Sequence, residues 1–220
     1  GAATGSLPYL PVVNDVPVPV YGWNWVPVDL AYGAVSADRV RHGVHLAAQA
    51  GATLMRVWGG GLLETDEFYH ACDREGILVW QEFVQSSSGI ESTPSRQPEF
   101  VRRLCRQAAV AVRARRHHPS LAIWCGGNEL ADADGHPLDV AHPALAALRK
   151  TVRRLDPERL FLPTSPSGPS FSNEPAPERQ AGTAIARAGG DQHDVHGPWE
   201  HQGLRSHYAR YDRATCQLLS

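Results

Sequence analysis

Hydrophobic residues along the chain alternate between two patterns, one typical of buried strands and the other of amphipathic helices. Short apolar runs are each followed by a stretch in which apolar residues recur every third or fourth position. The runs predict strands near residues 21, 54, 78, 121, 161, 191 and 216. The helical stretches between them begin near Ser36, Thr65 and Pro98, and a fourth carries Leu145 to Leu155.

Residues that begin or end helices support these positions. Ser36 is a favourable N-cap, and Pro98 suits the first turn of a helix. Gly76 and Pro119 are expected to stop the helices that precede them. Between residues 165 and 190 the chain is rich in Pro, Ser and Gly, so a long excursion is expected there.

This alternation predicts an α/β fold with a parallel sheet, either open or closed into a barrel. Polar residues at or just past the ends of different strands favour the barrel: Asn24, Arg56, Glu82, Asn128, Glu129, Ser165 and His193. In a (β/α)8 TIM barrel these strand ends converge on one pocket. A barrel needs eight strands and typically about 250 residues. Because seven strands are expected, the barrel is predicted to be truncated before the eighth.

The beginning of the chain predicts a separate small unit. In PYLPVVNDVPVPVYG, the pair Asn14 and Asp15 between valine-rich segments is expected to turn a hairpin. Residues 1–20 are therefore interpreted as a lead-in from a preceding domain. Residues 21–220 are interpreted as the incomplete barrel.

Composition and charge narrow the possible partners. A chain of 220 residues with 42% hydrophobic and 20% charged residues can bury one sizeable core. Its net charge of -2, without blocks of like charge, gives no reason to expect nucleic acid or an anionic membrane as partner. No apolar stretch reaches the roughly 20 residues that cross a bilayer, and no signal peptide is visible. Localisation stays open, with the cytoplasm slightly favoured.

No cofactor or metal is expected, and the cysteines encode neither a zinc ribbon nor a disulfide framework, because Cys72, Cys105, Cys125 and Cys216 lie far apart without a CxxC pair. An alternative comes from the histidine-rich segment near residue 195. Its ligand-type side chains would suit a metal-dependent hydrolase: Asp191, His193, His196 and His201. No HExxH helix accompanies them, and the metal content of the purified protein would decide.

The segment LAIWCGGNEL delivers Asn128 and Glu129 at the end of an expected buried strand. Desolvation beside Trp124 and Cys125 is expected to raise the pKa of Glu129, which suits a general acid. Asn128 could donate a hydrogen bond to a sugar hydroxyl. Alternatively, Glu129 stands in the first turn of a helix, where the dipole favours an anion.

Other polar and aromatic residues have structural as well as functional interpretations. Arg56 and Glu82 could form an ion pair between neighbouring strands. Trp80 is interpreted as core, whereas Trp23 and Trp25 could be core residues or sugar-stacking platforms. The three glycines at 59–61 lack the spacing of a phosphate-binding loop, so a turn near a ligand is expected.

Five blocks in this order resemble the catalytic barrel of family 2 glycoside hydrolases: GWNWVPVD, LMRVWGGGLLETDEFYHACDREGILVWQEF, RRHHPSLAIWCGGNE, SPSGP and DVHGPW. The resemblance is strongest to the β-mannosidase-like branch. It implies that Glu129 is the catalytic acid/base, that Asn128 touches the sugar 2-hydroxyl and that Arg56 lies near the nucleophile. It further implies substrate-binding roles for Trp58, Glu82, His193 and Trp199. The family usually has aspartate where Glu82 stands.

The resemblance implies a retaining exo-β-glycosidase of β-mannosidase-like specificity, with β-sandwich domains before the barrel. Its substrate would be a β-linked oligosaccharide or glycoside. Alternatives within the family are an exo-β-glucosaminidase or a β-galactosidase-like enzyme. A non-catalytic sugar-binding remnant is a further alternative.

In this family the nucleophile is a glutamate that follows a serine at the end of the seventh strand. The chain ends CQLLS, so Ser220 is expected to be that serine, with the glutamate as the next residue. Retaining hydrolysis needs two carboxyl groups about 5 Å apart. Residues 1–220 alone are therefore expected to be inactive.

Overall fold

The computed structural model of the chain describes residues 10–87, 91–167, 194–197, 201, 203–206 and 218–219. Its main feature is a five-stranded parallel sheet in which strands adjacent in sequence are also adjacent in space. The strands are β3 (Gly22–Trp25), β4 (Leu54–Val57), β5 (Leu78–Glu82), β6 (Leu121–Cys125) and β7 (Leu160–Leu162). This order confirms the predicted parallel α/β arrangement.

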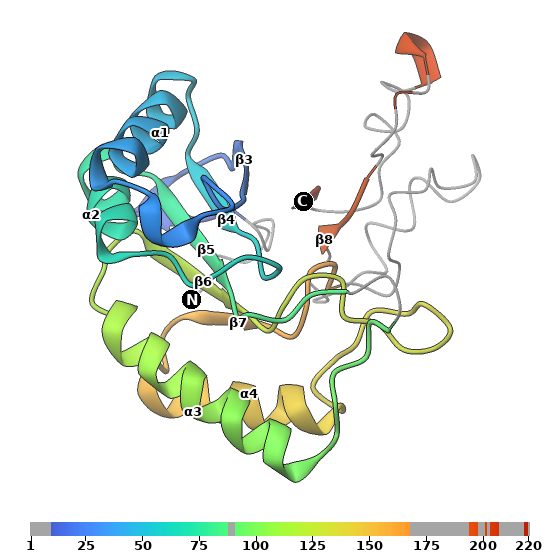
Figure 1. Cartoon of the computed structure of the whole chain (residues 1–220). Helices are drawn as coiled ribbons and strands as arrows, with labels where there is room; N and C mark the ends of the chain where they lie inside the picture. Colours follow the sequence, from blue (N-terminus) through green and yellow to red (C-terminus); the bar gives the residue numbers. More distant parts are fainter. Residues whose placement is uncertain are drawn as a thin grey trace.

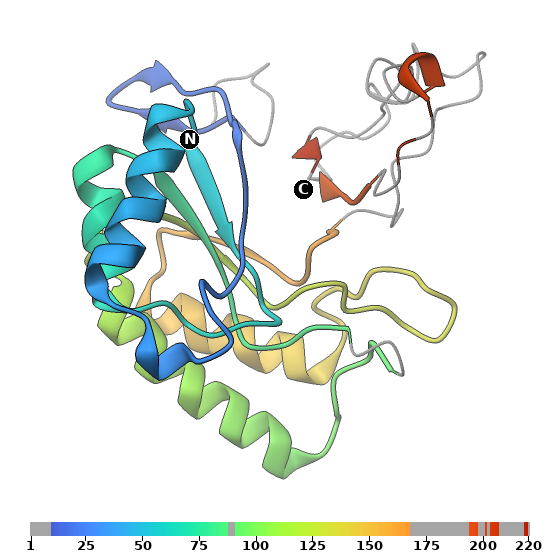
Figure 2. The same cartoon turned by 45° about the horizontal axis from the view of Figure 1, so that its top comes forward.

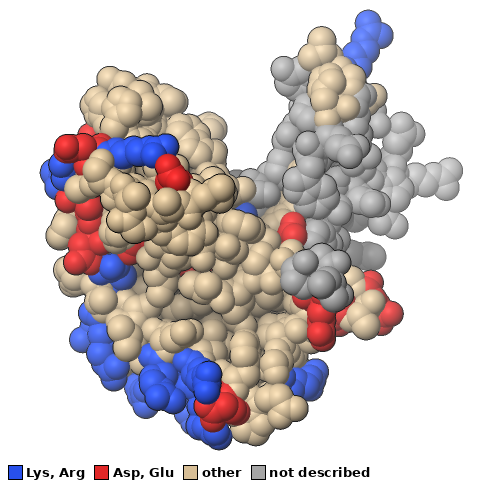
Figure 3. All heavy atoms as spheres, in the orientation of Figure 1, with Lys and Arg blue, Asp and Glu red and all other residues tan. Residues whose placement is uncertain are grey.

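One helix follows each of the first four strands of the sheet. These helices are α1 (Ala37–Gln49), α2 (Asp66–Glu75), α3 (Pro98–Arg115) and α4 (Pro143–Leu155), and a 3-10 turn, η1 (Tyr32–Ala34), precedes α1. All four lie on the outer side of the curved sheet, where α1 packs with α2 and α3 with α4 (Figure 1, Figure 2). Lys and Arg side chains gather over the outer surface of α3 and α4 (Figure 3). None of the described helices is long and apolar enough to span a bilayer.

The structure confirms the predicted helix ends at Ser36, Gly76 and Pro98. Each of these residues acts on the backbone of its own helix end. The Ser36 hydroxyl accepts a hydrogen bond from the Arg39 amide at 3.2 Å and so caps α1. Gly76 ends α2 with φ 73°, a left-handed conformation that glycine adopts without strain. Pro98 stands in the first turn of α3, as its missing N–H allows.

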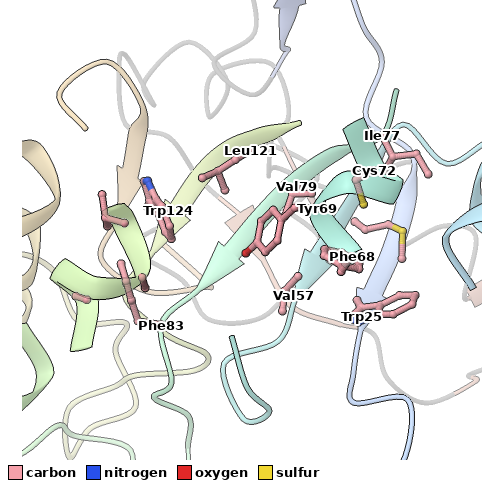
Figure 4. Packing of buried hydrophobic residues seen from close by; sticks show 14 of the residues in the cluster. Trp25, Val57, Phe68, Tyr69, Cys72, Ile77, Val79, Phe83, Leu121 and Trp124 are labelled. Carbon is pink, nitrogen blue, oxygen red and sulfur yellow. The ribbon is translucent and has the colours of Figure 1, made fainter. Parts of the chain in front are cut away.

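Side chains on the two faces of the sheet form two separate clusters. On the helix side, one cluster includes Val79 with Phe68 and Tyr69 of α2, and in it Trp124 stacks on Phe83 (Figure 4). On the inner side, the cluster consists of Leu54, Trp80, Ile123, Cys125 and Leu162. Because side chains alternate between faces, burial of both faces explains the almost continuously apolar strands.

The tryptophans divide between core and surface. Trp80 is buried in the inner cluster, as predicted. Trp25 is buried on the helix side, and its indole N–H donates to Glu64 at 2.9 Å. Trp23, at 47% exposed, faces solvent.

The hairpin and the last two strands complete the described part. β1 (Val12–Val13) and β2 (Val16–Pro17) pair antiparallel around Asn14 and Asp15, whose φ values of 51° and 65° define a tight hairpin turn. β8 (Asp194–Val195) and β9 (Leu218–Leu219) pair in parallel. Most of the predicted excursion, residues 168–193, lies outside the described residues.

Candidate active site

The hydrogen bonding of β6 continues past its last residue and fixes the segment that follows. Asn128 forms parallel bridges to Ser86 on one side and Ser165 on the other. Its amide donates to the Gln85 carbonyl at 2.9 Å, and the Glu129 amide donates to the Ser165 carbonyl at 2.6 Å. Asn128 and Glu129 are therefore held from both sides by the segments that follow β5 and β7.

The two glycines before Asn128 allow this close approach. A Cβ at Gly126 would lie 2.0 Å from the Pro163 carbonyl oxygen, and one at Gly127 would lie 2.6 Å from the Gln85 carbonyl oxygen. Both distances are far below van der Waals contact. A side chain at either position would push the neighbouring segment away from Asn128.

Glu129 occupies a backbone conformation that few residues adopt. Its φ is 53°, and α4 begins only at Pro143, so the alternative that placed it in the first turn of a helix is wrong. One carboxylate oxygen, Oε2, accepts from the Ser87 hydroxyl at 2.8 Å. The other, Oε1, lies 2.9 Å from Nδ1 of His196.

These contacts overturn the expectation that the pKa of Glu129 is raised. The hydrogen bond with His196 is the largest influence and lowers this pKa, while partial burial raises it and the Ser87 hydroxyl lowers it further. The net pKa lies below the ordinary value for glutamate. The carboxyl is half-buried rather than enclosed by Trp124 and Cys125, with a side chain 25% exposed.

Arg56 connects three of the predicted residues on the inner side of the sheet. Its Nε and Nη2 donate to Oε1 of Glu82 at 2.9 and 2.8 Å. Nη1 donates to Asn24 Oδ1 at 2.9 Å. Nη2 also donates to Asn128 Oδ1 at 2.7 Å. The guanidinium therefore links the ends of β3, β4 and β5 with the segment after β6.

Glu82 lies behind Arg56 and is almost completely buried. Its Oε2 accepts from the Gly59 amide at 2.7 Å, while Oε1 is taken by Arg56. Burial raises the pKa of Glu82, and the charge of Arg56 opposes this rise. The predicted ion pair between Arg56 and Glu82 is confirmed.

A hollow of about 300 Å³ opens above these residues. It is lined by Asn24, Val26, Arg56, Trp58, Ser86, Ser87, Asn128, Glu129 and His196. Four of the predicted site residues therefore meet here: Arg56, Trp58, Asn128 and Glu129. Glu82 lies beneath Arg56 and does not line the hollow. Two other predicted site residues, His193 and Trp199, lie outside the described residues.

Sequence reasoning missed Ser87 and placed His196 only in a hypothetical metal site. The strand was expected near residue 191, which made His193 its terminal polar residue. Because β8 begins at Asp194, His196 comes to the strand end instead. The tripeptide Asp-Val-His was visible in the sequence, but its register was not.

Two groups of side chains in the described part could hold a metal ion, and neither of them lines the hollow. Groups whose ligand atoms could hold an ion are His70 with Asp73 and His118, and Asp132 with Asp134 and His136. In the alternative metal site, Asp191 and His193 lie outside the described residues.

The parallel sheet, its outer helices and the hollow are consistent with part of an α/β barrel of the TIM class, with an acid, an amide and a guanidinium at C-terminal strand ends. Residues 28–165 match the family model of "Glycosyl hydrolases family 2, TIM barrel domain". The chain belongs to this family, which confirms the resemblance and the predicted fold class.

Relatives in this family are β-mannosidases. Beta-mannosidase B of Emericella nidulans is 33% identical over 174 residues, which cover 71% of this chain and 20% of that protein. Beta-mannosidase of Mus musculus is 32% identical over 168 residues, which cover 70% of this chain and 19% of that protein. The chain thus spans about a fifth of the length of these relatives.

Solved structures agree on the fold. The β-D-mannosidase of Dictyoglomus thermophilum is 29% identical, with a TM-score of 0.68 over 86% of this chain and 22% of that chain. A β-glucuronidase of Parabacteroides merdae, 21% identical with a TM-score of 0.57, covers 68% of this chain and 18% of that chain and shares the fold.

Proposed function

We propose that the chain supplies the catalytic barrel of a retaining exo-β-glycosidase that removes a terminal β-linked mannose. The observation that carries this proposal is the Glu129 carboxyl in the hollow, beside Asn128 and Arg56. Family membership and the β-mannosidase relatives support the reaction class and the sugar. The role of each residue is inferred from its chemistry in the hollow.

Glu129 is proposed as the general acid and base. In the first step its carboxyl proton passes to the glycosidic oxygen, which leaves with the aglycone. In the second step the carboxylate takes a proton from water, whose oxygen attacks the sugar carbon. The carboxyl group ends the cycle protonated, as it began.

Asn128 is proposed to bind a sugar hydroxyl, and its surroundings fix the direction of its amide. Its Oδ1 accepts from Arg56, and its Nδ2 donates to the Ser86 hydroxyl at 3.1 Å. Since Nδ2 carries two hydrogens, the second is available to a hydroxyl of the sugar. Arg56 thereby orients the amide as well as lining the hollow.

The remaining predicted residues contribute less directly. Trp58 lines the hollow and offers an apolar face to the sugar. Glu82 acts through Arg56, because both of its oxygens are already bound within the protein. His193 and Trp199 are proposed to bind substrate by family resemblance alone.

A second carboxyl group is needed for the covalent intermediate. Among the described residues that line the hollow, Glu129 is the carboxylate. The nucleophile is proposed to lie in a part of the relatives' length that this chain does not span. Hydrolysis of an activated aryl β-mannoside is therefore expected from a protein of the relatives' length and not from residues 1–220 alone.

Glu129→Gln, in the longer protein, tests the proposed acid role. The amide cannot protonate the leaving oxygen, so kcat/KM should fall by about 10²-fold or more for alkyl β-mannosides and far less for activated aryl β-mannosides. Equal losses on both substrate types would remove Glu129 from the acid role. Glu158→Gln, on the exposed turn before β7, is the matched control.

Sugar preference can be measured on the same variant, because the amide leaves the hollow nearly unchanged in shape. Calorimetric titration with mannose, glucosamine and galactose should rank mannose first. A clear preference for glucosamine or galactose would instead support one of the alternative specificities.

A further inference from the structure

A row of hydrogen bonds leads from β8 to the proposed acid. Ser165 Oγ donates to Oδ2 of Asp194 at 2.6 Å and lies 3.0 Å from Nε2 of His196. The other ring nitrogen of His196, Nδ1, lies 2.9 Å from Oε1 of Glu129. Asp194, Ser165 and His196 are all buried, so this row is shielded from bulk water.

The row fixes which nitrogen of His196 carries a hydrogen. A serine hydroxyl has one hydrogen, and that of Ser165 points to the carboxylate of Asp194. The serine oxygen can therefore only accept from His196, so Nε2 carries a hydrogen in every charge state. Nδ1 is then either a bare acceptor facing a protonated Glu129 or an N–H donor facing a Glu129 carboxylate.

We propose that His196 is a positioning residue that shares one proton with Glu129, so that the acid/base of this site is a carboxyl–imidazole pair. This inference rests on the proposed function, because Glu129 is the acid of that reaction. The shared proton lies either on Oε1 of Glu129 with His196 neutral, or on Nδ1 with Glu129 ionised. Moving it breaks one bond and forms the other, while the Nε2–H bond stays intact.

Sharing of the proton determines which atoms of Glu129 and His196 are protonated after each catalytic step. After Glu129 gives the shared proton to the leaving oxygen, the carboxylate keeps its hydrogen bond from Ser87, and Nδ1 of His196 is left as a bare acceptor. When water returns a proton to the carboxylate, Nδ1 is an alternative resting place for it.

Charged groups from each neighbouring strand act on the pair. Arg56 on β4 favours the carboxylate form of Glu129, whereas Glu82 on β5 and Asp194 on β8 favour a positive imidazole. These influences favour the form in which Glu129 is ionised. The pKa of Glu129 is accordingly lowered, with the hydrogen bond to His196 as the largest cause.

Nitrogen NMR of protein labelled with ¹⁵N at histidine tests the pairing without any need for turnover. The His196 signal is identified by its loss in His196→Asn. At high pH the neutral ring should carry its hydrogen on Nε2, and the positive ring should persist to higher pH in the wild type than in Glu129→Gln. A neutral ring with the hydrogen on Nδ1, or the same titration in both proteins, would overturn the proposal.

The pH dependence of kcat/KM on an alkyl β-mannoside gives a second test in the longer protein. On the alkaline side the wild-type rate should fall when the pair loses its single shared proton. In His196→Gln the fall should begin at lower pH, as for an isolated carboxyl, while exposed His42→Gln keeps the wild-type profile. An alkaline fall at the same pH in His196→Gln would contradict sharing, whereas absence of activity in every protein would instead refute the proposed function.

Discussion

At the scale of single residues, Glu129 combines an uncommon backbone conformation with a reactive side chain. A residue with a Cβ in the left-handed region lies about 1–2 kcal/mol above its right-handed conformation. The hydrogen bonds of its own amide and of Asn128 hold it there. Such strain is common where the surrounding structure dictates the direction of a functional group.

Backbone strain at Glu129 predicts an unusual order of stability between two variants. Glu129→Gly and Glu129→Ala both lose the contacts with Ser87 and His196 and differ only in the Cβ. Because glycine adopts φ near +53° freely, Glu129→Gly should be about 1 kcal/mol more stable to urea unfolding than Glu129→Ala. At Glu158, whose φ is negative, the same pair should show the usual advantage of alanine. An advantage of alanine at both positions would show that Glu129 is unstrained.

The position of Glu129 was predictable from the sequence, but its ionisation was not. The apolar run before it and the two glycines place it at the end of a strand. Its pKa depends on Ser87, 42 residues earlier, and on His196, 67 residues later. Neither contact follows from local pattern, because each is created by pairing of distant segments.

At the scale of elements, one aspartate joins α2 to the beginning of β6. Asp73 accepts from the Ser120 amide at 3.0 Å and lies 2.6 Å from Nδ1 of His118. Burial raises the pKa of Asp73, but the hydrogen bonds from His118 and Ser120 outweigh it and the net pKa is lowered. The helix is thereby attached to the end of the sheet opposite the hollow.

Asp73→Asn should therefore lower the free energy of unfolding by about 1–3 kcal/mol at neutral pH, the usual effect of losing hydrogen bonds to a charged group. A carboxyl with a lowered folded pKa stabilises the protein above its unfolded value near pH 4 and loses this effect as pH falls through the folded pKa. The difference in free energy of unfolding between Asp73→Asn and the wild type should thus shrink below about pH 4. Urea unfolding across this range measures it, with exposed Asp134→Asn as control. A difference that stays constant to pH 3 would contradict a charge-based contact.

Elements defined by local signals were predicted well, whereas the position of β8 was not. The helix ends depend on local backbone and capping properties of Ser36, Gly76 and Pro98. These properties can be read from the sequence without knowledge of distant contacts. β8 follows a long Pro- and Gly-rich stretch, and only its pairing partners determine its first residue. The strand was predicted three residues too early, so His193 was expected at the strand end where the structure has His196.

At the scale of the whole molecule, the sheet of the described part has an open edge. β3 pairs with β4 on one side, and its exposed residues include Trp23, while the nearby Tyr21 is 65% exposed. In a closed barrel each strand pairs on both sides, so this edge of β3 must meet another strand. An uncovered edge with exposed aromatic residues promotes association between chains.

Hydrogen exchange should therefore distinguish residues 1–220 from a protein of the relatives' length. In the shorter chain, peptides covering Gly22–Trp25 should exchange much faster than peptides covering the central strand β5. In the longer protein both should be protected, and its tendency to aggregate should be lower. Equal protection of the two strands in residues 1–220 would show that β3 is already covered there. Mass spectrometry resolves the two peptides in one experiment.

The left-handed backbone at Glu129 also bears on how the gene has been maintained. A single A-to-G change in either glutamate codon yields glycine, and the resulting chain would relieve the strain at this position. The same change would remove the hydrogen bonds with Ser87 and His196, so the strained backbone at this position is maintained together with the contacts of the carboxylate.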